Sequence, residues 1–136
     1  MSMRWVKGRT RIKWLPSTTS QAMSANSLAS ISSGKIIPAT SSTTKHPGIN
    51  LKAVTSASAE YATSLPLPIE VPLERDCELE ATTTATLAAT QVGDDGDLTD
   101  ASTVNMGAST HKVVTCTAFI SSTLGRYKLN NQSILA

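Results

Sequence analysis

The chain has 136 residues, with 12 basic, 10 acidic and only 5 aromatic side chains, a length that fits one domain. It contains no run of about 18 apolar residues, so no membrane-spanning helix and no membrane partner are expected, and its two cysteines are too few for a disulfide-rich scaffold. Residues 1–50 carry seven basic residues and no acidic one, whereas residues 51–136 carry five basic and all ten acidic residues.

Residues 1–20 predict an extended basic arm. From Arg9 to Lys13 the basic residues occupy every second position, so in a strand they share one face, and Gly8 and Pro16 disfavour a helix. Ordering such an arm costs conformational entropy, so something must hold it. Tryptophan and arginine are frequent anchors of protein interfaces. The predicted partner-binding residues are Arg4, Trp5, Lys7, Arg9, Arg11, Lys13, Trp14 and Leu15.

The next segment predicts a hairpin and a further strand. Residues 27–31 alternate apolar and polar side chains, and Ser32-Ser33-Gly34 is typical of a tight turn. Residues 35–40 follow as a short strand that Pro38 places at an edge. Residues 49–54 alternate again.

The second half predicts several more strands. Residues 65–74 contain three prolines, which exclude a helix and predict an extended edge strand. The other expected strands are 77–82, short strands within 94–105, 111–121 (the clearest of all), and a last strand after a turn at Leu124-Gly125. The stretches 55–64 and 83–93 are expected to be loops with at most one helical turn.

Many short strands without a long helical pattern predict an all-β fold, a small β-barrel or sandwich domain with an extended basic N-terminal arm. The arm is expected over residues 1–20 and the barrel-like domain over residues 21–136. No internal repeat is visible in the sequence.

Several residue groups invite a chemical interpretation. Using Gly96 as the glycine of a calcium-binding loop places Gln91 and Gly93 at ligand positions, so the motif fails and a solvated Asp-Gly turn is favoured. Glu78 and Glu80 could serve acid–base chemistry, but a charged solvent face is far more common. His46 and His111 lie in no triad-like signature, and no glycine-rich phosphate loop occurs. We therefore expect no enzyme and no catalytic, cofactor-binding or metal-binding residue.

Cys77 and Cys116 both lie in strand-like segments. The favoured interpretation is two reduced thiols that act as small apolar side chains. A disulfide between them stays open as an alternative, because it requires only that their Cα atoms approach within about 7 Å.

The order of short pieces along residues 20–131 resembles small virion structural proteins of tailed bacteriophages, of the capsid decoration or cement type. The pieces are Gly34 to Thr40, Gly48 to Leu51, Tyr61 to Thr63, Leu67 to Pro72, Val92-Gly93, Asp97 to Asp100, Thr103 to Asn105, Phe119 to Ser121 and Gly125 to Tyr127. The tryptophan-containing arm has no counterpart in that family.

The resemblance implies a β-barrel-like domain on the outer surface of an icosahedral virion. Such proteins bind between major capsid protein subunits and stabilise the shell, and many of them form trimers there. The family brings no catalytic residue and no cofactor. In this interpretation the basic arm anchors the protein to the shell.

A second interpretation is a nucleic-acid-binding or ribonucleoprotein subunit. Its arm would pair phosphates with basic side chains and stack tryptophans on bases. Residues 51–136 carry a net charge of −5 and would repel nucleic acid, so a protein partner is favoured and a nucleic-acid partner is not expected. An enzyme with a serine or glutamate site is the weakest interpretation.

Overall fold

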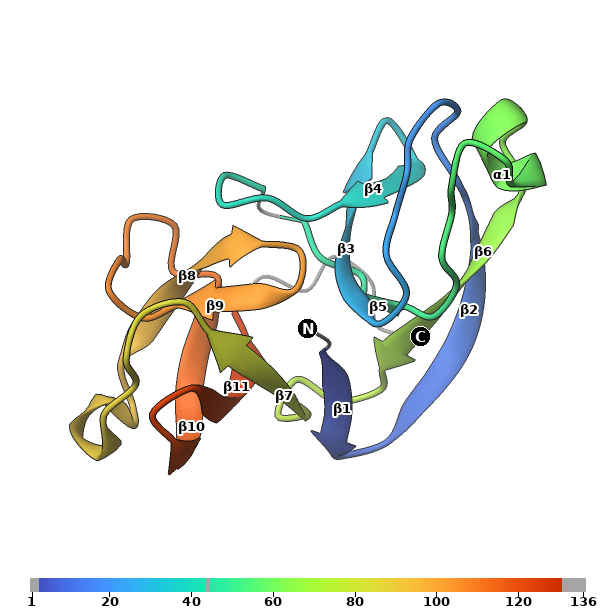
Figure 1. Cartoon of the computed structure of the whole chain (residues 1–136). Coiled ribbons are helices and arrows are strands. Elements are labelled where there is room, and N and C mark those ends of the chain that lie inside the picture. The colour runs from blue at the N-terminus through green and yellow to red at the C-terminus, as the bar shows by residue number, and fades with distance from the viewer. Residues whose placement is uncertain (1–2, 44, 131–136) are drawn as a thin grey trace.

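The structure is a computed structural model that describes residues 3–43 and 45–130. These residues form β-strands with one turn of α-helix, α1 (Ala59–Ala62), and one turn of 3₁₀-helix, η1 (Ala89–Gln91). Two curved sheets lie side by side (Figure 1). The expected all-β class is confirmed, with a small closed barrel and a second sheet beside it.

The first sheet has the strand order β2-β6-β5-β3-β4. Its strands are β2 (Thr10–Pro16), β3 (Ser27–Ser32), β4 (Lys35–Pro38), β5 (Ile49–Asn50) and β6 (Pro66–Pro72). All neighbours in this order are antiparallel. One parallel bridge, between Ser17 after β2 and Ile36 in β4, joins the two ends of the sheet. We call this unit the N-terminal barrel; it is open along most of β2.

The second sheet has the order β1-β7-β11-β10-β8-β9. Its strands are β1 (Arg4–Lys7), β7 (Glu78–Thr83), β8 (Asp95–Asp100), β9 (Thr103–Asn105), β10 (Val114–Ser121) and β11 (Leu124–Leu129). A parallel pairing between the end of β7 and β9 closes β7 to β11 into a barrel, which we call the C-terminal barrel. The first half of β7 pairs with β1 instead.

The two barrels share one topology. Replacing β2 to β6 by β7 to β11, strand for strand, converts the order of the first barrel into that of the second. In both barrels the first and third strands meet in parallel. Ser17 bridges Ile36 in one barrel, and Thr83 pairs with Val104 in the other.

Backbone hydrogen bonds at this contact fix the correspondence. The N–H of Ser17 donates to the carbonyl of Leu65 at 3.0 Å, and the N–H of Thr83 donates to the carbonyl of Thr123 at 2.9 Å. Both bonds link the end of the first strand to the residue before the fifth. Residues 12–18 of the first barrel therefore correspond to residues 78–84 of the second.

A left-handed residue shortly before the second strand also agrees between the barrels. Asn26 (φ 56°) and Gly93 (φ 95°) both have left-handed backbone. Their N–H groups donate to the carbonyls of Asn50 at 2.7 Å and Cys116 at 2.8 Å. The chain is thus a structural duplication. The sequence hides it, because equivalent positions such as these carry different side chains.

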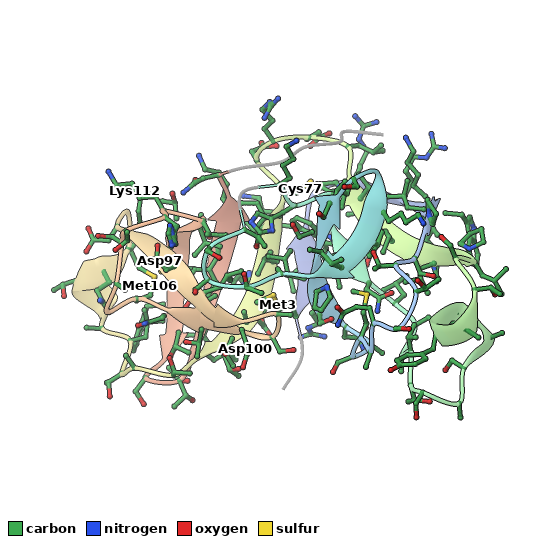
Figure 2. The ribbon with its side chains drawn as sticks, turned by 90° about the horizontal axis from the view of Figure 1, so that it is seen from above. Met3, Cys77, Asp97, Asp100, Met106 and Lys112 are labelled. Atoms are coloured by element: carbon green, nitrogen blue, oxygen red, sulfur yellow. The ribbon has the colours of Figure 1, made fainter. Side chains whose placement is uncertain are left out.

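The two barrels share an apolar core. Leu28 and Ile49 of the N-terminal barrel pack into the same cluster as Leu79 and Tyr127 of the C-terminal barrel. Met3, which is 1 % exposed, belongs to this cluster and lies where the barrels meet (Figure 2). A second cluster, which includes three alternate residues of β6, fills the N-terminal barrel. The barrels therefore pack as one unit.

The expected arm is part of these sheets. Within the described part of residues 1–20, β1 pairs with β7 and β2 pairs with β6. The extended conformation is confirmed, but the chain itself holds it. A boundary at residue 20 therefore does not separate an arm from a domain over residues 21–136. The paired residues lie from 50 positions apart (Pro16 with Pro66) to 76 positions apart (Arg4 with Glu80), beyond the reach of local sequence patterns.

Strand β6 lies inside the sheet, although its prolines predict an edge strand. Leu65 and Leu73 flank β6, and their backbone groups bond to Ser17 and Arg9, which flank β2. The backbone N–H and C=O groups of the odd-numbered residues of β6 therefore face β2. The prolines at 66, 68 and 72 all have even numbers and turn toward β5. Because β5 is only two residues long, it needs no N–H from these prolines, and the β2–β6 ladder keeps its donors.

The predicted hairpin at residues 27–38 is confirmed. Its two turn residues, Ser33 (φ 52°) and Gly34 (φ 77°), are left-handed, as in the tight turns that suit hairpin twist. The turn expected at Leu124-Gly125 was placed too late, because both residues lie in β11 and the turn is at residues 122–123.

Candidate partner-binding edge

Three of the predicted partner-binding side chains form ion pairs within the chain. The pairs are Arg4–Glu80 at 3.2 Å, Lys7–Glu78 at 3.2 Å and Arg9–Glu74 at 2.9 Å. The basic partners are largely exposed, so each pair adds little to stability. The pairs nevertheless compensate most of the positive charge at the start of the chain.

Glu78 and Glu80 do not form the solvated face that was favoured for them. Each side chain is only 15 % exposed, because β1 lies beside β7. The Thr117 hydroxyl donates to Glu78 at 2.7 Å. This hydrogen bond, and to a lesser degree Lys7, lowers the pKa of Glu78. The two carboxylates therefore join β1 and β10 to β7.

Trp5 and Leu15 are packing residues. The Trp5 indole N–H donates to the Glu70 carbonyl at 3.0 Å, and the half-buried ring packs against the shared core. Leu15 packs against the core of the N-terminal barrel. Neither side chain is free to anchor a partner.

The remaining three predicted residues lie together on β2. Trp14 is 63 % exposed, and Arg11 and Lys13 form no ion pair among the described residues. Ile12, which is 50 % exposed, lies between them and was not predicted as a binding residue. The two-residue period of a strand could have revealed it, because Ile12 and Trp14 share one face. We call Arg11, Ile12, Lys13 and Trp14 the β2 edge.

Asp94 and Asp100 are exposed, but Asp95-Gly96 lies in a strand and not in the expected solvated turn. Asp95 and Asp97 lie in β8, and Asp97 is 4 % exposed. The Asp97 carboxylate accepts three backbone N–H groups, from Thr110 at 3.0 Å and from His111 and Lys112 at 2.8 Å each; Asp97 and Lys112 appear close together in Figure 2. Asp97 therefore anchors the loop before β10. In the described part of the chain, no three acidic, histidine or cysteine side chains gather into a metal site.

His46 and the two cysteines are likewise structural. His46 is buried, its Nε2 lies 3.1 Å from the Thr43 carbonyl, and burial lowers its pKa. Cys77 and Cys116 are both buried and free, which confirms the interpretation as reduced thiols. Burial raises the pKa of the Cys116 thiol, which makes it a poor nucleophile.

A surface hollow of about 480 Å³ is lined by residues from the segment 22–55 and by Ala101, which lies in the turn between β8 and β9. Its lining includes Met23, Pro38, Val54 and Ala101 but no ionisable side chain. Neither described helix has the length and apolar character that crossing a membrane requires.

No protein-family model matches the chain, and no curated protein matches it either. The geometry of the β2 edge and the resemblance to decoration proteins therefore carry the functional proposal.

Proposed function

We propose that the protein is a virion structural protein that binds the outer surface of a capsid shell, between major capsid protein subunits, and stabilises the shell. The observation that carries the proposal is the exposed pair Ile12 and Trp14 on β2, alternating with Arg11 and Lys13. Large apolar side chains on an open strand mark interaction sites, and tryptophan and arginine dominate binding energy at interfaces.

The packing of the β2 edge supports docking on a rigid protein surface. The strand is held along its whole length by β6, so it is already ordered before a partner arrives. Binding then loses little conformational entropy, which favours affinity. The resemblance to decoration proteins supplies the kind of partner, and a trimer on the shell belongs to the same proposal.

The ion pairs weigh against a nucleic-acid partner. Arg4, Lys7 and Arg9 already face acidic side chains of the chain. Only Arg11 and Lys13 of the five basic residues at residues 4–13 stay without one among the described residues. Nucleic-acid affinity depends on the number of phosphates neutralised, and two cations can neutralise only a few phosphates.

Replacing Trp14 by serine tests the proposal. The full chain is produced together with the major capsid protein of its proposed virion, and its occupancy on assembled shells is measured by gradient sedimentation. Trp14→Ser should weaken shell binding at least about tenfold, as expected for an interface anchor. Phe119→Ser is the matched control, because Phe119 is an exposed aromatic residue (40 %) of the other barrel.

Equal occupancy of Trp14→Ser and Phe119→Ser would contradict the proposal. Binding to bare nucleic acid that falls steeply with added salt, with no binding to shells, would replace it by the nucleic-acid alternative.

A further inference from the structure

Within the described residues, β7 has a neighbouring strand, β1, that has no counterpart in the N-terminal barrel. In the C-terminal barrel, β1 lies antiparallel to the first half of β7. Its residues Arg4, Trp5 and Lys7 pair with Glu80, Leu79 and Glu78. Strand β9 continues along the same side of β7 at residues 82–83. The side of β7 that faces away from β11 is thereby covered from residue 78 onward.

The corresponding place beside β2 is open. Residues 78–80 of β7 correspond to residues 12–14 of β2, since Thr83 corresponds to Ser17. Strand β4 meets the chain only at the bridge from Ser17. Across residues 3–43 and 45–130, no strand pairs with β2 on this side. In this part of the chain, the N-terminal barrel thus has no counterpart of β1.

The main chain of the β2 edge is oriented to receive such a strand. The N–H of Ser17 points to the β6 side, and the N–H of Thr18 points to β4, where it donates at 3.2 Å. Successive residues of a strand alternate in this direction, and β2 pairs with β6 without a register shift. The N–H and C=O groups of Ile12 and Trp14 therefore face the open side. No backbone hydrogen bond from the described residues reaches them.

The side chains of the β2 edge indicate what kind of strand fits. Glu78 and Glu80 are covered by β1 and its two cations, whereas their counterparts Ile12 and Trp14 are 50 % and 63 % exposed. Apolar residues opposite Ile12 and Trp14 would bury this area. Lys13 lies between them without an acidic partner in the described chain, so the residue opposite it should be acidic.

We propose that the open side of β2 takes up one extended segment of a shell subunit, antiparallel to β2, in which an acidic residue opposite Lys13 lies between two apolar residues. The segment completes the N-terminal barrel as β1 completes the C-terminal barrel. Addition of a strand to an exposed sheet edge is a common way to bind peptides. The assignment of the segment to a shell subunit rests on the proposed function; the strand addition itself does not.

Amide hydrogen exchange of the full chain tests the strand addition. The probe is the blocked peptide acetyl-Val-Glu-Val-Glu-Val-amide, and its control is the same peptide with alternate backbone nitrogens methylated. The first peptide should slow exchange at the Ile12 and Trp14 amides at least about tenfold. The amides of Arg11 and Lys13, which already face β6, should change little. The methylated peptide should not bind, because it cannot complete the backbone ladder.

Two variants test the same point on shells. Ile12→Pro removes one outward N–H and leaves the β2–β6 ladder intact, whereas Ile12→Thr keeps that N–H. Ile12→Pro should lose at least tenfold more shell affinity than Ile12→Thr. If Ile12→Pro does not fold, as judged by circular dichroism, the exchange measurement on the unmodified chain decides.

Three outcomes would overturn the strand addition: no peptide binding, equal binding of the methylated peptide, or binding without protection of Ile12 and Trp14. If Ile12→Pro and Ile12→Thr bind shells equally while Trp14→Ser does not bind, the strand addition fails and the proposed function stands. If no variant or unmodified chain binds shells but the peptide protects the two amides, the proposed function fails and the strand addition stands.

Discussion

Ser30 of the N-terminal barrel and Asp97 of the C-terminal barrel occupy equivalent positions, and each holds a loop through a different kind of hydrogen bond. Each lies one position before a pair that joins the second and third strands, Ile31 with Ile36 and Leu98 with Val104. The Ser30 hydroxyl donates to the Lys45 carbonyl at 2.7 Å, whereas the Asp97 carboxylate accepts three N–H groups of residues 110–112. Both side chains tie down the loop between the third and fourth strands.

Asp97→Ala should lower the free energy of unfolding by about 3 kcal/mol, because it leaves three N–H groups without their charged acceptor. Urea unfolding monitored by tryptophan fluorescence measures this change. Asp94→Ala is the control, since Asp94 is exposed and should shift stability by less than about 0.5 kcal/mol. A loss below about 1 kcal/mol at Asp97 would show that solvent replaces the carboxylate.

At the scale of elements, β7 is the strand on which the fold depends most. It pairs with β1, β9 and β11, and its carboxylates reach β1 and β10. A lowered pKa in the folded state means that the unfolded chain binds the proton of Glu78 more tightly. Glu78 therefore contributes stability that is present above its unfolded value of 4.5 and is lost as pH falls through the lower folded value.

Unfolding at pH 6 and at pH 3 should reveal this contribution. Glu78→Gln should flatten the loss of stability on acidification, and Thr117→Val, which removes the main cause of the lowered pKa, should flatten it in part with the carboxylate still present. The same pH dependence in both variants and in the unmodified chain would contradict the assignment.

Local patterns predict local elements well in this chain. The hairpin at residues 27–38 is confirmed because the turn residues and the alternation that produce it lie within a dozen positions. The edge position predicted for β6 was wrong, and the pairing of β1 with β7 was not predicted. Both depend on residues that lie far apart in the sequence. At the candidate site, Trp14 is exposed and available to a partner. The Trp5 indole, by contrast, donates to the Glu70 carbonyl and packs against the core. Nothing in a two-residue alternation distinguishes these two tryptophans.

At the scale of the whole molecule, β1 joins the two barrels. It belongs to the C-terminal barrel but precedes β2, and the chain crosses between them at Gly8, whose φ of 91° and close approach to Cys77 leave no room for a Cβ atom. Trp5 of this strand and Met3 just before it contribute to the shared core. The duplication itself was not predictable, because Lys13 and Leu79 occupy equivalent positions with opposite polarity.

Deleting residues 1–8 should lower the free energy of unfolding by at least about 4 kcal/mol, since it uncovers β7 and removes two packed side chains worth about 1.5–3 kcal/mol each. Thermal and urea unfolding measure the loss, and absence of a cooperative transition is its extreme form. The double variant Arg4→Ala with Lys7→Ala is the control, because it removes only exposed ion pairs and should cost about 1 kcal/mol. A deletion that costs no more than this control would contradict the role of β1.

The place of β1 also sets an order in time. On the ribosome β1 emerges before its partner β7, which follows about 70 residues later, a delay of roughly 4–14 s at common rates of synthesis. During this interval β2 to β6 can already form the N-terminal barrel. β1 is still unpaired, and Met3 and Trp5 are still exposed. A waiting strand on a short hinge can dock on the β7 of a neighbouring copy instead of its own. Where many copies are synthesised together, β1 can therefore complete its own molecule or be swapped between two molecules.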